Sequence, residues 1–167
     1  MKIKIPVRYL PRNLSSKDKK KQLQMLLKSR KMYKKHNYFT RKSLPSYKTK
    51  TSKHITRAKK IYNLENVLPN KELSQKTGCS LESLKKIVNK GEGAYFSSGS
   101  RPNQTAQSWG YARLGSAITG QKAAAVDYSI IESGCKKSGK AYKLAKQAKQ
   151  KYGSGHSATR KIKITSK

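Results

Sequence analysis

Residues 70–90 decide the fold, and they read NKELSQKTGCSLESLKKIVNK. Apolar residues recur at helical spacing on both sides of Gly78, and they include Leu73, Leu84 and Ile87. Ser80 stands where a second helix would begin, and a Ser side chain at that position caps free backbone N–H groups. The stretch therefore predicts two short helices joined by a turn at Gly78, and with it a mainly α fold class.

A helical pair of this kind has two interpretations. In a DNA-reading helix-turn-helix, the second helix would offer its polar side chains to a groove, and here these are Glu82, Ser83, Lys85, Lys86 and Asn89. Any helical hairpin with Gly in its turn shows the same spacing. Packing within a small helical core is the simpler interpretation, and we favour it over DNA reading.

The next block, residues 91–105, reads GEGAYFSSGSRPNQT and is rich in Gly and Ser. It predicts a loop that positions Arg101 and Asn103, followed by a helix from about Ala106 to Ile118 that Asn103 or Thr105 caps. The two glycines at its start resemble part of a phosphate-binding loop, but neither the full glycine motif nor a following Lys-Ser or Lys-Thr is present. Nucleotide binding is therefore not expected.

The only tryptophan of the chain, Trp109, is expected to anchor the core together with Ala112, Leu114 and Ile118. A minor strand is expected near residues 124–131. Seven residues of the central region are candidates for core or interaction contacts: Gly91, Gly93, Tyr95, Arg101, Asn103, Trp109 and Arg113.

The charge of the chain is concentrated at its ends. The 167 residues carry 40 Lys and Arg against 7 Asp and Glu, a formal net charge of +33. Residues 1–60 contribute +20 and residues 136–167 contribute +11, whereas residues 61–135 contribute only +2. We therefore expect a near-neutral helical core at 61–135 between a basic N-terminal arm with one helix, 1–60, and a basic C-terminal arm, 136–167. Both arms are expected to be extended.

Each arm contains one predicted helix. Ser15 or Ser16 would begin a helix over about Lys17 to Lys35, with a narrow apolar stripe that includes Leu23, Leu26 and Leu27. Residues 139–153 predict a short Ala/Lys helix, and residues 159–165 alternate like a strand. Residues 38–61 are expected to be a linker, in which aromatic residues between cations could stack on bases or anchor a loop.

Seven carboxylates cannot neutralise forty cations, so a polyanion is the expected partner. Nucleic acid, an acidic membrane surface and an acidic protein face are the alternatives. Lysine outnumbers arginine, which favours attraction to phosphate without base reading. The candidate polyanion-binding or partner-binding residues are Lys19, Lys20, Lys21, Lys28, Arg30, Lys31, Lys34, Lys35, Arg41, Lys42, Lys143, Lys146 and Lys149.

No pattern in the chain predicts an enzyme, a metal site or a cofactor. His36, His54 and His156 are far apart, and the carboxylates are scattered. Cys79 and Cys135 form no CxxC motif, and two reduced, partly buried thiols are expected rather than a disulfide. The start of the chain lacks the apolar region of a signal peptide, and no apolar run reaches membrane-spanning length, so a soluble protein is expected.

Residues 91–114, GEGAYFSSGSRPNQTAQSWGYARL, are distinctive. With VRYLP at 7–11, SSKDKKKQ at 15–22 and TGCS at 77–80, they make residues 7–135 resemble an uncharacterised family of small basic proteins of nucleocytoplasmic large DNA viruses, which infect algae and amoebae. The resemblance implies a viral setting, with an icosahedral capsid, an internal membrane and a packed DNA genome. It assigns no functional residue.

In that setting we expect a non-enzymatic minor capsid protein on the inner face of the shell, made in the host cytoplasm and incorporated into the virion. Its partners would be the major and other minor capsid proteins, with DNA or the inner membrane surface beneath. The alternative is a DNA-condensing protein packaged with the genome without reading its sequence. A third hypothesis, an enzyme acting on DNA, has no residue pattern in its favour.

Overall fold

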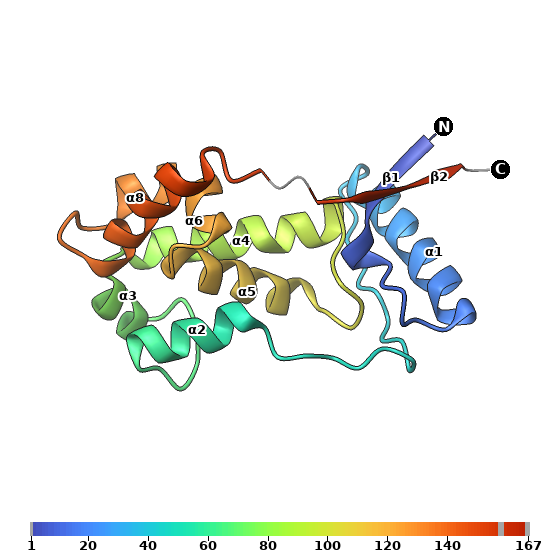
Figure 1. Ribbon diagram of the computed structural model, residues 1–167, viewed down its shortest axis with the longest axis horizontal. Coiled ribbons are helices and arrows are strands. Elements are labelled where there is room, and N and C mark those ends of the chain that lie inside the picture. Colours follow the sequence, from blue (N-terminus) through green and yellow to red (C-terminus); the bar gives the residue numbers. More distant parts are fainter. Residues whose placement is uncertain (1, 157–158, 166–167) are drawn as a thin grey trace. The chain divides into compact units, whose positions relative to one another are not determined.

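The computed structural model describes residues 2–156 and 159–165 and is mainly helical, as the sequence predicts (Figure 1). The chain divides into two compact units. The basic unit comprises Met1–Lys50, Gly93–Ala106 and Ala158–Lys167, and the helical unit comprises Thr51–Glu92 and Gln107–Ser157. This division differs from the expected boundaries after residues 60 and 135.

The basic unit begins with strand β1, Lys2–Pro6, and a 3₁₀ turn, Val7–Tyr9, which precede helix α1, Ser16–Tyr33. Strand β2, Lys161–Thr165, pairs antiparallel with β1, so the two ends of the chain lie side by side (Figure 1). The register places Ile3 opposite Ile164 and Ile5 opposite Ile162. The isoleucines share one face of this ribbon, because residues directly opposite one another point to the same side.

Helix α1 begins where the sequence predicts. The Ser15 side chain accepts a hydrogen bond from the Asp18 N–H at 3.1 Å and so caps the helix. Its buried face consists of Asp18, Gln22, Met25, Leu26 and Ser29. This face is more polar than the predicted leucine stripe, in which Leu26 is buried while Leu23 and Leu27 are only partly so.

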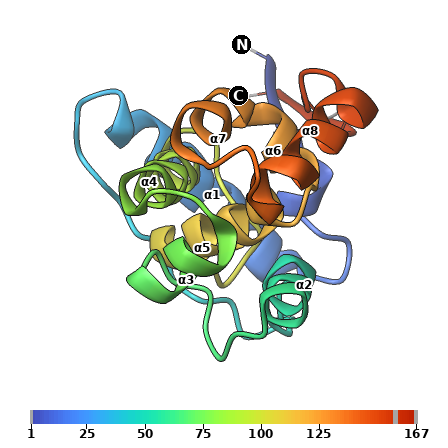
Figure 2. The same cartoon turned by 90° about the vertical axis from the view of Figure 1, so that its left-hand side faces the viewer.

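The helical unit contains α2, Lys53–Tyr62, α3, Lys71–Thr77, and most of α4, Leu81–Ser97. It continues with α5, Ala106–Ile118, α6, Lys122–Val126, α7, Tyr128–Gly134, and α8, Lys140–Tyr152. In the view of Figure 2, α5 lies in the middle of this unit. Residues 114–118, the last turn of α5, and residue 119 after it are buried, in agreement with that position.

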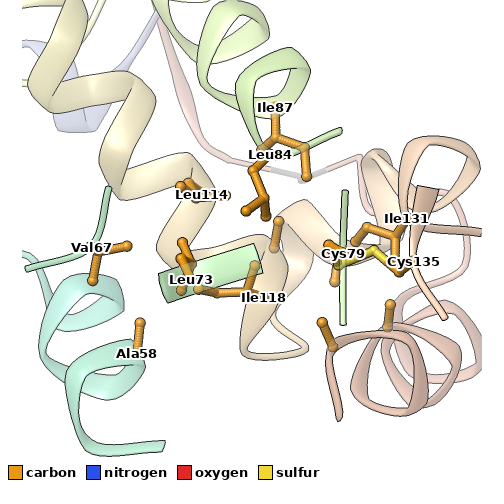
Figure 3. Close-up of a cluster of buried hydrophobic side chains, with 14 of the residues drawn as sticks. Ala58, Val67, Leu73, Cys79, Leu84, Ile87, Leu114, Ile118, Ile131 and Cys135 are labelled. Carbon is orange, nitrogen blue, oxygen red and sulfur yellow. A yellow bond between two sulfur atoms is a disulfide. The ribbon is translucent and has the colours of Figure 1, made fainter. Parts of the chain in front are cut away.

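The predicted helical pair at Gly78 is confirmed. Asn70 caps α3 by accepting from the Leu73 N–H at 2.9 Å, and Gly78 ends the helix with φ +78°. Ser80 caps α4 by accepting from the Ser83 N–H at 3.2 Å. Leu73, Leu84 and Ile87 are almost fully buried and meet Leu114 and Ile118 of α5 in the core (Figure 3). The helix predicted over Ala106–Ile118 is likewise confirmed, with the same bounds.

Gly91 and Gly93 lie inside α4, so the prediction of a loop from residue 91 is wrong. Gly91 serves helix packing instead. A Cβ on Gly91 would lie 2.6 Å from the Gly110 Cα, and a Cβ on Gly110 would lie 2.7 Å from the Val88 carbonyl oxygen. The two helices can cross this closely only because both positions lack a side chain.

Trp109 does not anchor the core, contrary to the prediction. It is partly exposed, whereas Gly110, Leu114, Ala117 and Ile118 form the buried side of α5. Trp109 and Leu114 are five positions apart on the helix, and this spacing places them on different sides. The expected strand at 124–131 is also wrong, because these residues belong to α6 and α7.

Cys79 and Cys135 form a disulfide, which corrects the expectation of two free thiols (Figure 3). The residues that flank them are paired like neighbouring strands. The Ser80 N–H donates to the Gly134 carbonyl at 2.7 Å, and the Lys136 N–H donates to the Gly78 carbonyl at 2.8 Å. These two bonds bring together cysteines that are 56 positions apart in the sequence.

The structure also corrects the expectation of extended arms. Strand β1 and helix α1 contribute the buried residues Ile5, Tyr9 and Leu26, and residues 41 and 44 of the expected linker are buried as well. In the C-terminal arm the helix predicted over 139–153 is confirmed as α8, and it buries one row of alanines. None of the helices within residues 2–156 and 159–165 combines the length and the apolar character that crossing a membrane requires.

Candidate polyanion-binding surface

Helix α1 presents a row of lysines to solvent. Lys17, Lys20, Lys21, Lys28 and Lys31 are exposed on the side away from its buried face, and Lys35 continues the row in the turn that ends the helix. We call these six residues the lysine face. They extend over about 27 Å, given a rise of about 1.5 Å per residue. Over that length one strand of a DNA duplex carries about eight phosphates.

The basic unit carries 22 Lys and Arg and a single carboxylate, Asp18, for a net charge of +21. Asp18 is buried, and its Oδ2 atom accepts from the Ser46 hydroxyl at 2.6 Å and from the Ser46 N–H at 3.0 Å. These two hydrogen bonds hold the pKa of Asp18 below its ordinary value. The carboxylate is thus ionised and hydrogen-bonded within the unit. Because it is buried, no exposed Asp or Glu of this unit stands beside the cations.

A hollow of about 430 Å³ lies on the same unit, beside strand β2 and the start of the chain. Three aliphatic side chains, Val7, Leu10 and Ile162, contribute to its wall. Five cations line the rest: Arg12, Lys19, Arg160, Lys161 and Lys163. Of these five cations, only Lys19 was among the predicted binding residues. The other four become its neighbours through the pairing of the two chain ends, which the sequence does not show.

The β1–β2 ribbon adds a second cationic face. Lys2, Lys4, Lys161 and Lys163 are exposed, while the isoleucines of the other face are buried or partly buried. The register sets Lys4 directly opposite Lys163. Like charges in this position are destabilising, so the ribbon favours an anion beside it.

The predicted polyanion-binding residues of the helical unit lie on α8. Lys143, Lys146 and Lys149 are exposed, while Ala141, Ala145 and Ala148 of the same helix are buried. Lys149 lies over the Tyr128 ring, with its Nζ atom 6.0 Å from the ring centroid. These lysines make the exposed side of α8 positive, but this unit also contains six carboxylates.

Two predicted polyanion-binding residues have internal roles instead. Arg41 is 6% exposed, and its guanidinium donates to the Ser29 and Ser100 hydroxyls, both at 2.9 Å, and lies 3.8 Å from the Tyr95 ring centroid. Arg30 donates to the Ser98 carbonyl from Nε at 2.9 Å and from Nη2 at 2.7 Å. Burial lowers the pKa of both guanidinium groups. Both arginines support the fold. Arg41 is buried, which corrects the prediction that it binds a partner, whereas Arg30 is partly exposed and partner binding there stays a prediction.

The remaining lysines of the prediction, Lys34 and Lys42, are exposed. Tyr95 is fully buried, and its hydroxyl accepts a hydrogen bond from the Arg41 N–H at 2.9 Å. Gly93 lies near Tyr33, since a Cβ there would meet the Tyr33 hydroxyl oxygen at 3.7 Å. Tyr95 thus serves packing within the basic unit, whereas a side chain at Gly93 would make only an ordinary contact.

Arg101 is exposed. Asn103, in contrast, forms hydrogen bonds with residues 44 and 47 of the segment that was expected to be a linker. The Asn103 Oδ1 atom accepts from the Leu44 N–H at 2.7 Å, and Nδ2 donates to the Tyr47 carbonyl at 2.9 Å and to the Leu44 carbonyl at 3.3 Å. Its backbone has φ +61°, a conformation that Asn tolerates better than most residues. The loop after α4 holds Asn103, and the Asn103 side chain orders residues 44–49.

Arg113 forms an ion pair in the helical unit with Asp127, which is fully buried. The Nε and Nη2 atoms each donate to Asp127 at 2.8 Å, and Lys90 Nζ lies 2.8 Å from the Oδ1 atom. Burial by itself would raise the pKa of Asp127, but the hydrogen bonds and charges of Arg113 and Lys90 outweigh it and lower that pKa. This triad of Lys90, Arg113 and Asp127 could not be seen in the sequence, because its members are far apart along the chain.

The exposed surface of α4 is poorly suited to reading DNA. Ser83 is buried, and a Cβ on Gly134 would overlap its hydroxyl. Lys86 pairs with Glu82 at 3.1 Å, and Glu82 would repel a phosphate backbone. Within residues 2–156 and 159–165, no three His, Cys, Asp or Glu side chains gather where they could hold a metal ion.

Residues 6–133 match the model of a family of unknown function, DUF5824. The chain belongs to this family. No curated protein and no solved structure matches it. The match covers α1 to α6 and nearly all of α7, and so includes the lysine face of α1 but not α8.

Proposed function

We propose that this protein binds nucleic acid through its phosphates, without reading base sequence, and that the lysine face of α1 is the principal contact. The observation that carries the proposal is the charge arrangement of the basic unit. Its lysines are exposed in a row, and its single carboxylate is buried and hydrogen-bonded. A phosphate backbone is the polyanion whose regular charge spacing such a row can follow.

The chemistry of the exposed cations supports binding without base reading. Arginine is the side chain that most often reads guanine, because its planar fork donates two parallel hydrogen bonds. Two arginines of the basic unit, Arg30 and Arg41, already donate to groups within that unit. The lysine ammonium is a hydrated point charge that binds phosphate without a preferred base.

A minor capsid protein remains the second hypothesis, and its viral setting remains an expectation from the resemblance of residues 7–135. We place it second because threading between capsid proteins calls for extended arms, and α1 and α8 are folded helices with buried faces. Virions opened gently and treated with nuclease and moderate salt would separate the two roles. A shell component would stay with the emptied shell, whereas a genome-binding protein would be released.

The experiment is a salt titration of binding, measured by fluorescence anisotropy with labelled 20-base-pair duplexes of two unrelated sequences. We expect equal affinity for both sequences and a steep linear fall of log K with log salt concentration. Replacing Lys20, Lys31 and Lys35 by Gln should reduce the slope by about 2 to 3, since each phosphate contact contributes about 0.9.

The matched control replaces Lys71, Lys85 and Lys137 by Gln. These three lysines are exposed on separate segments of the helical unit, and their loss gives the same net charge. The control should keep the slope of the unmodified protein. A slope that falls equally in both variants would remove α1 as the principal contact. Affinity that differs strongly between the two sequences, or that ignores salt, would overturn the proposal itself.

A further inference from the structure

Tyr38 is the most exposed large apolar side chain in the part of the chain that the structure describes, with 68% of its surface accessible. It lies in the basic unit, five residues after the end of α1. Contacts within the protein cover only part of the ring, so its exposed part can contact a ligand. Its surroundings indicate what could cover it.

The ring is held in place from behind by other aromatic side chains. The Tyr38 and Phe96 ring centroids are 5.1 Å apart, and those of Tyr38 and Tyr33 are 6.1 Å apart. Phe96 in turn makes an edge contact at 5.0 Å with Tyr95, which is fully buried. Tyr38 is thus the exposed end of an aromatic row that begins in the interior of the basic unit.

The backbone before Tyr38 is also fixed. The turn that ends α1 is closed by hydrogen bonds from the His36 N–H to the Tyr33 carbonyl at 2.9 Å and from the Asn37 N–H to the Met32 carbonyl at 3.0 Å. An exposed ring on a fixed backbone loses little conformational freedom when a ligand covers it. This preorganisation suits a binding platform.

Cations flank the ring along the chain. Lys34, Lys35 and Lys42 are exposed and lie within four residues of Tyr38. Lys28 of the lysine face lies over the next aromatic residue, Phe39, with its Nζ atom 4.5 Å from the ring centroid. Because Asp18 is the only carboxylate of this unit and is buried, no exposed acid of the unit opposes an anionic ligand here.

We propose that Tyr38 is a stacking platform for an unpaired base of single-stranded nucleic acid, whose phosphates bind the neighbouring lysines. Flat aromatic rings among cations are how proteins bind single strands without sequence preference, because every base has a face that can stack. In a duplex the bases already stack on one another, so the platform adds affinity only for single strands. The inference rests on the proposed function and assigns it a substrate class.

The test separates bases from phosphates. Anisotropy is measured with a labelled 12-nucleotide strand of thymidines, and with an abasic strand that has the same length and charge. We expect the unmodified protein to bind the thymidine strand at least about fivefold more tightly, in line with the usual contribution of one stacked base. The Tyr38→Ala variant should lose this preference and keep its affinity for the abasic strand.

Two further variants separate the effect of a flat ring from the effect of apolar surface. Tyr38→Trp retains a flat ring and should retain the preference, whereas Tyr38→Leu retains apolar surface without a ring and should lose it. Leu81→Ala, at an exposed apolar residue of the helical unit, is the control and should change nothing. Circular dichroism confirms that each variant is folded.

The possible failures are distinguishable. Equal affinity of the unmodified protein for thymidine and abasic strands would overturn the stacking site and leave phosphate binding intact. A preference that survives in Tyr38→Ala would place the base contact elsewhere and would also overturn it. Failure to bind either strand at low salt would count against the proposed function itself.

Discussion

The two units of this protein differ in how far carboxylates offset their positive charge. The helical unit offsets its 18 Lys and Arg with six carboxylates, and it surrounds one of these, Asp127, with two cations. The basic unit sets 22 cations against one buried carboxylate. Self-repulsion therefore acts mainly on the basic unit, and the same excess makes it the binding surface in our proposal.

Their interiors differ as well. The helical unit has a continuous apolar core and a disulfide (Figure 3). In the basic unit, polar side chains fill buried positions. Gln22 donates to the Tyr9 carbonyl at 3.1 Å, the Ser29 hydroxyl donates to the Phe96 carbonyl at 3.1 Å, and Arg41 lies on Tyr95. Both units bury apolar side chains, but polar side chains make up a larger share of the buried residues in the basic unit.

The largest effect should come from breaking the disulfide of the helical unit. It closes a loop of 56 positions, so its loss should lower the free energy of unfolding by about 4 kcal/mol on the chain-entropy model. Denaturant titrations of a Cys79→Ala, Cys135→Ala double variant measure this loss. A reducing agent should bring the unmodified protein to the level of the variant and should leave the variant unchanged. Resistance of the unmodified protein to reductant would contradict the prediction.

The next effect concerns the buried ion pair of the same unit. Asp127→Asn removes the charge that both Arg113 and Lys90 contact, and it should cost about 3 kcal/mol, because breaking a buried ion pair leaves cations without a counterion. Thermal unfolding at neutral pH measures the loss. The exposed pair Lys86 and Glu82 provides the control, and Glu82→Gln should change stability by less than about 0.5 kcal/mol.

The same pair predicts a dependence on pH. The pKa of Asp127 is lower in the folded protein than its ordinary value of 3.8. The stabilisation is therefore complete above that value and is lost as the pH falls below it through the folded-state pKa. Asp127→Asn should be less sensitive to acid in this range than the unmodified protein. Some sensitivity will remain, since the pKa of Asp18 is also lowered.

How much of this could be predicted from sequence depends on the range of the interactions. Local signals located α1, α3, α4, α5 and α8, because caps such as Ser15 and Ser80 and the apolar spacing act within a few residues. The charge pattern also showed that the exposed lysines of α1 are candidates for polyanion binding. These features are set by neighbours along the chain.

Contacts between distant segments could not be predicted. The β1–β2 pairing joins the two ends of the chain, and the disulfide and the Arg113–Asp127 pair join residues separated by whole helices. Arg41 shows the functional consequence. In the sequence it is one more cation in a basic stretch, and only its contacts with Ser29, Ser100 and Tyr95 show that it is unavailable to a ligand.

A smaller effect tests the polar stabilisation of the basic unit. Asn103→Ala removes the hydrogen bonds to Leu44 and Tyr47 and places Ala at a positive φ, and it should cost about 2 kcal/mol. Hydrogen exchange should show faster exchange in residues 44–49 and little change in the helical unit. Asn37→Ala, at an exposed residue of the same unit, is the control and should be nearly neutral. Slower or unchanged exchange at 44–49 would show that Asn103 does not order this segment.

The smallest effect concerns self-repulsion in the ribbon. Lys163→Glu places an acid directly opposite Lys4 and should slow amide exchange in β1 and β2, by an amount equivalent to about 0.5 kcal/mol in 0.1 M salt. Lys161→Glu makes the same change of charge opposite Pro6, where no cation faces it, and so measures the general benefit of a lower net charge. The difference between the two variants should vanish in 1 M salt, where the Debye length falls to about 3 Å. Equal exchange in both variants at low salt would mean that repulsion in the basic unit is diffuse and does not depend on the Lys4 and Lys163 pair.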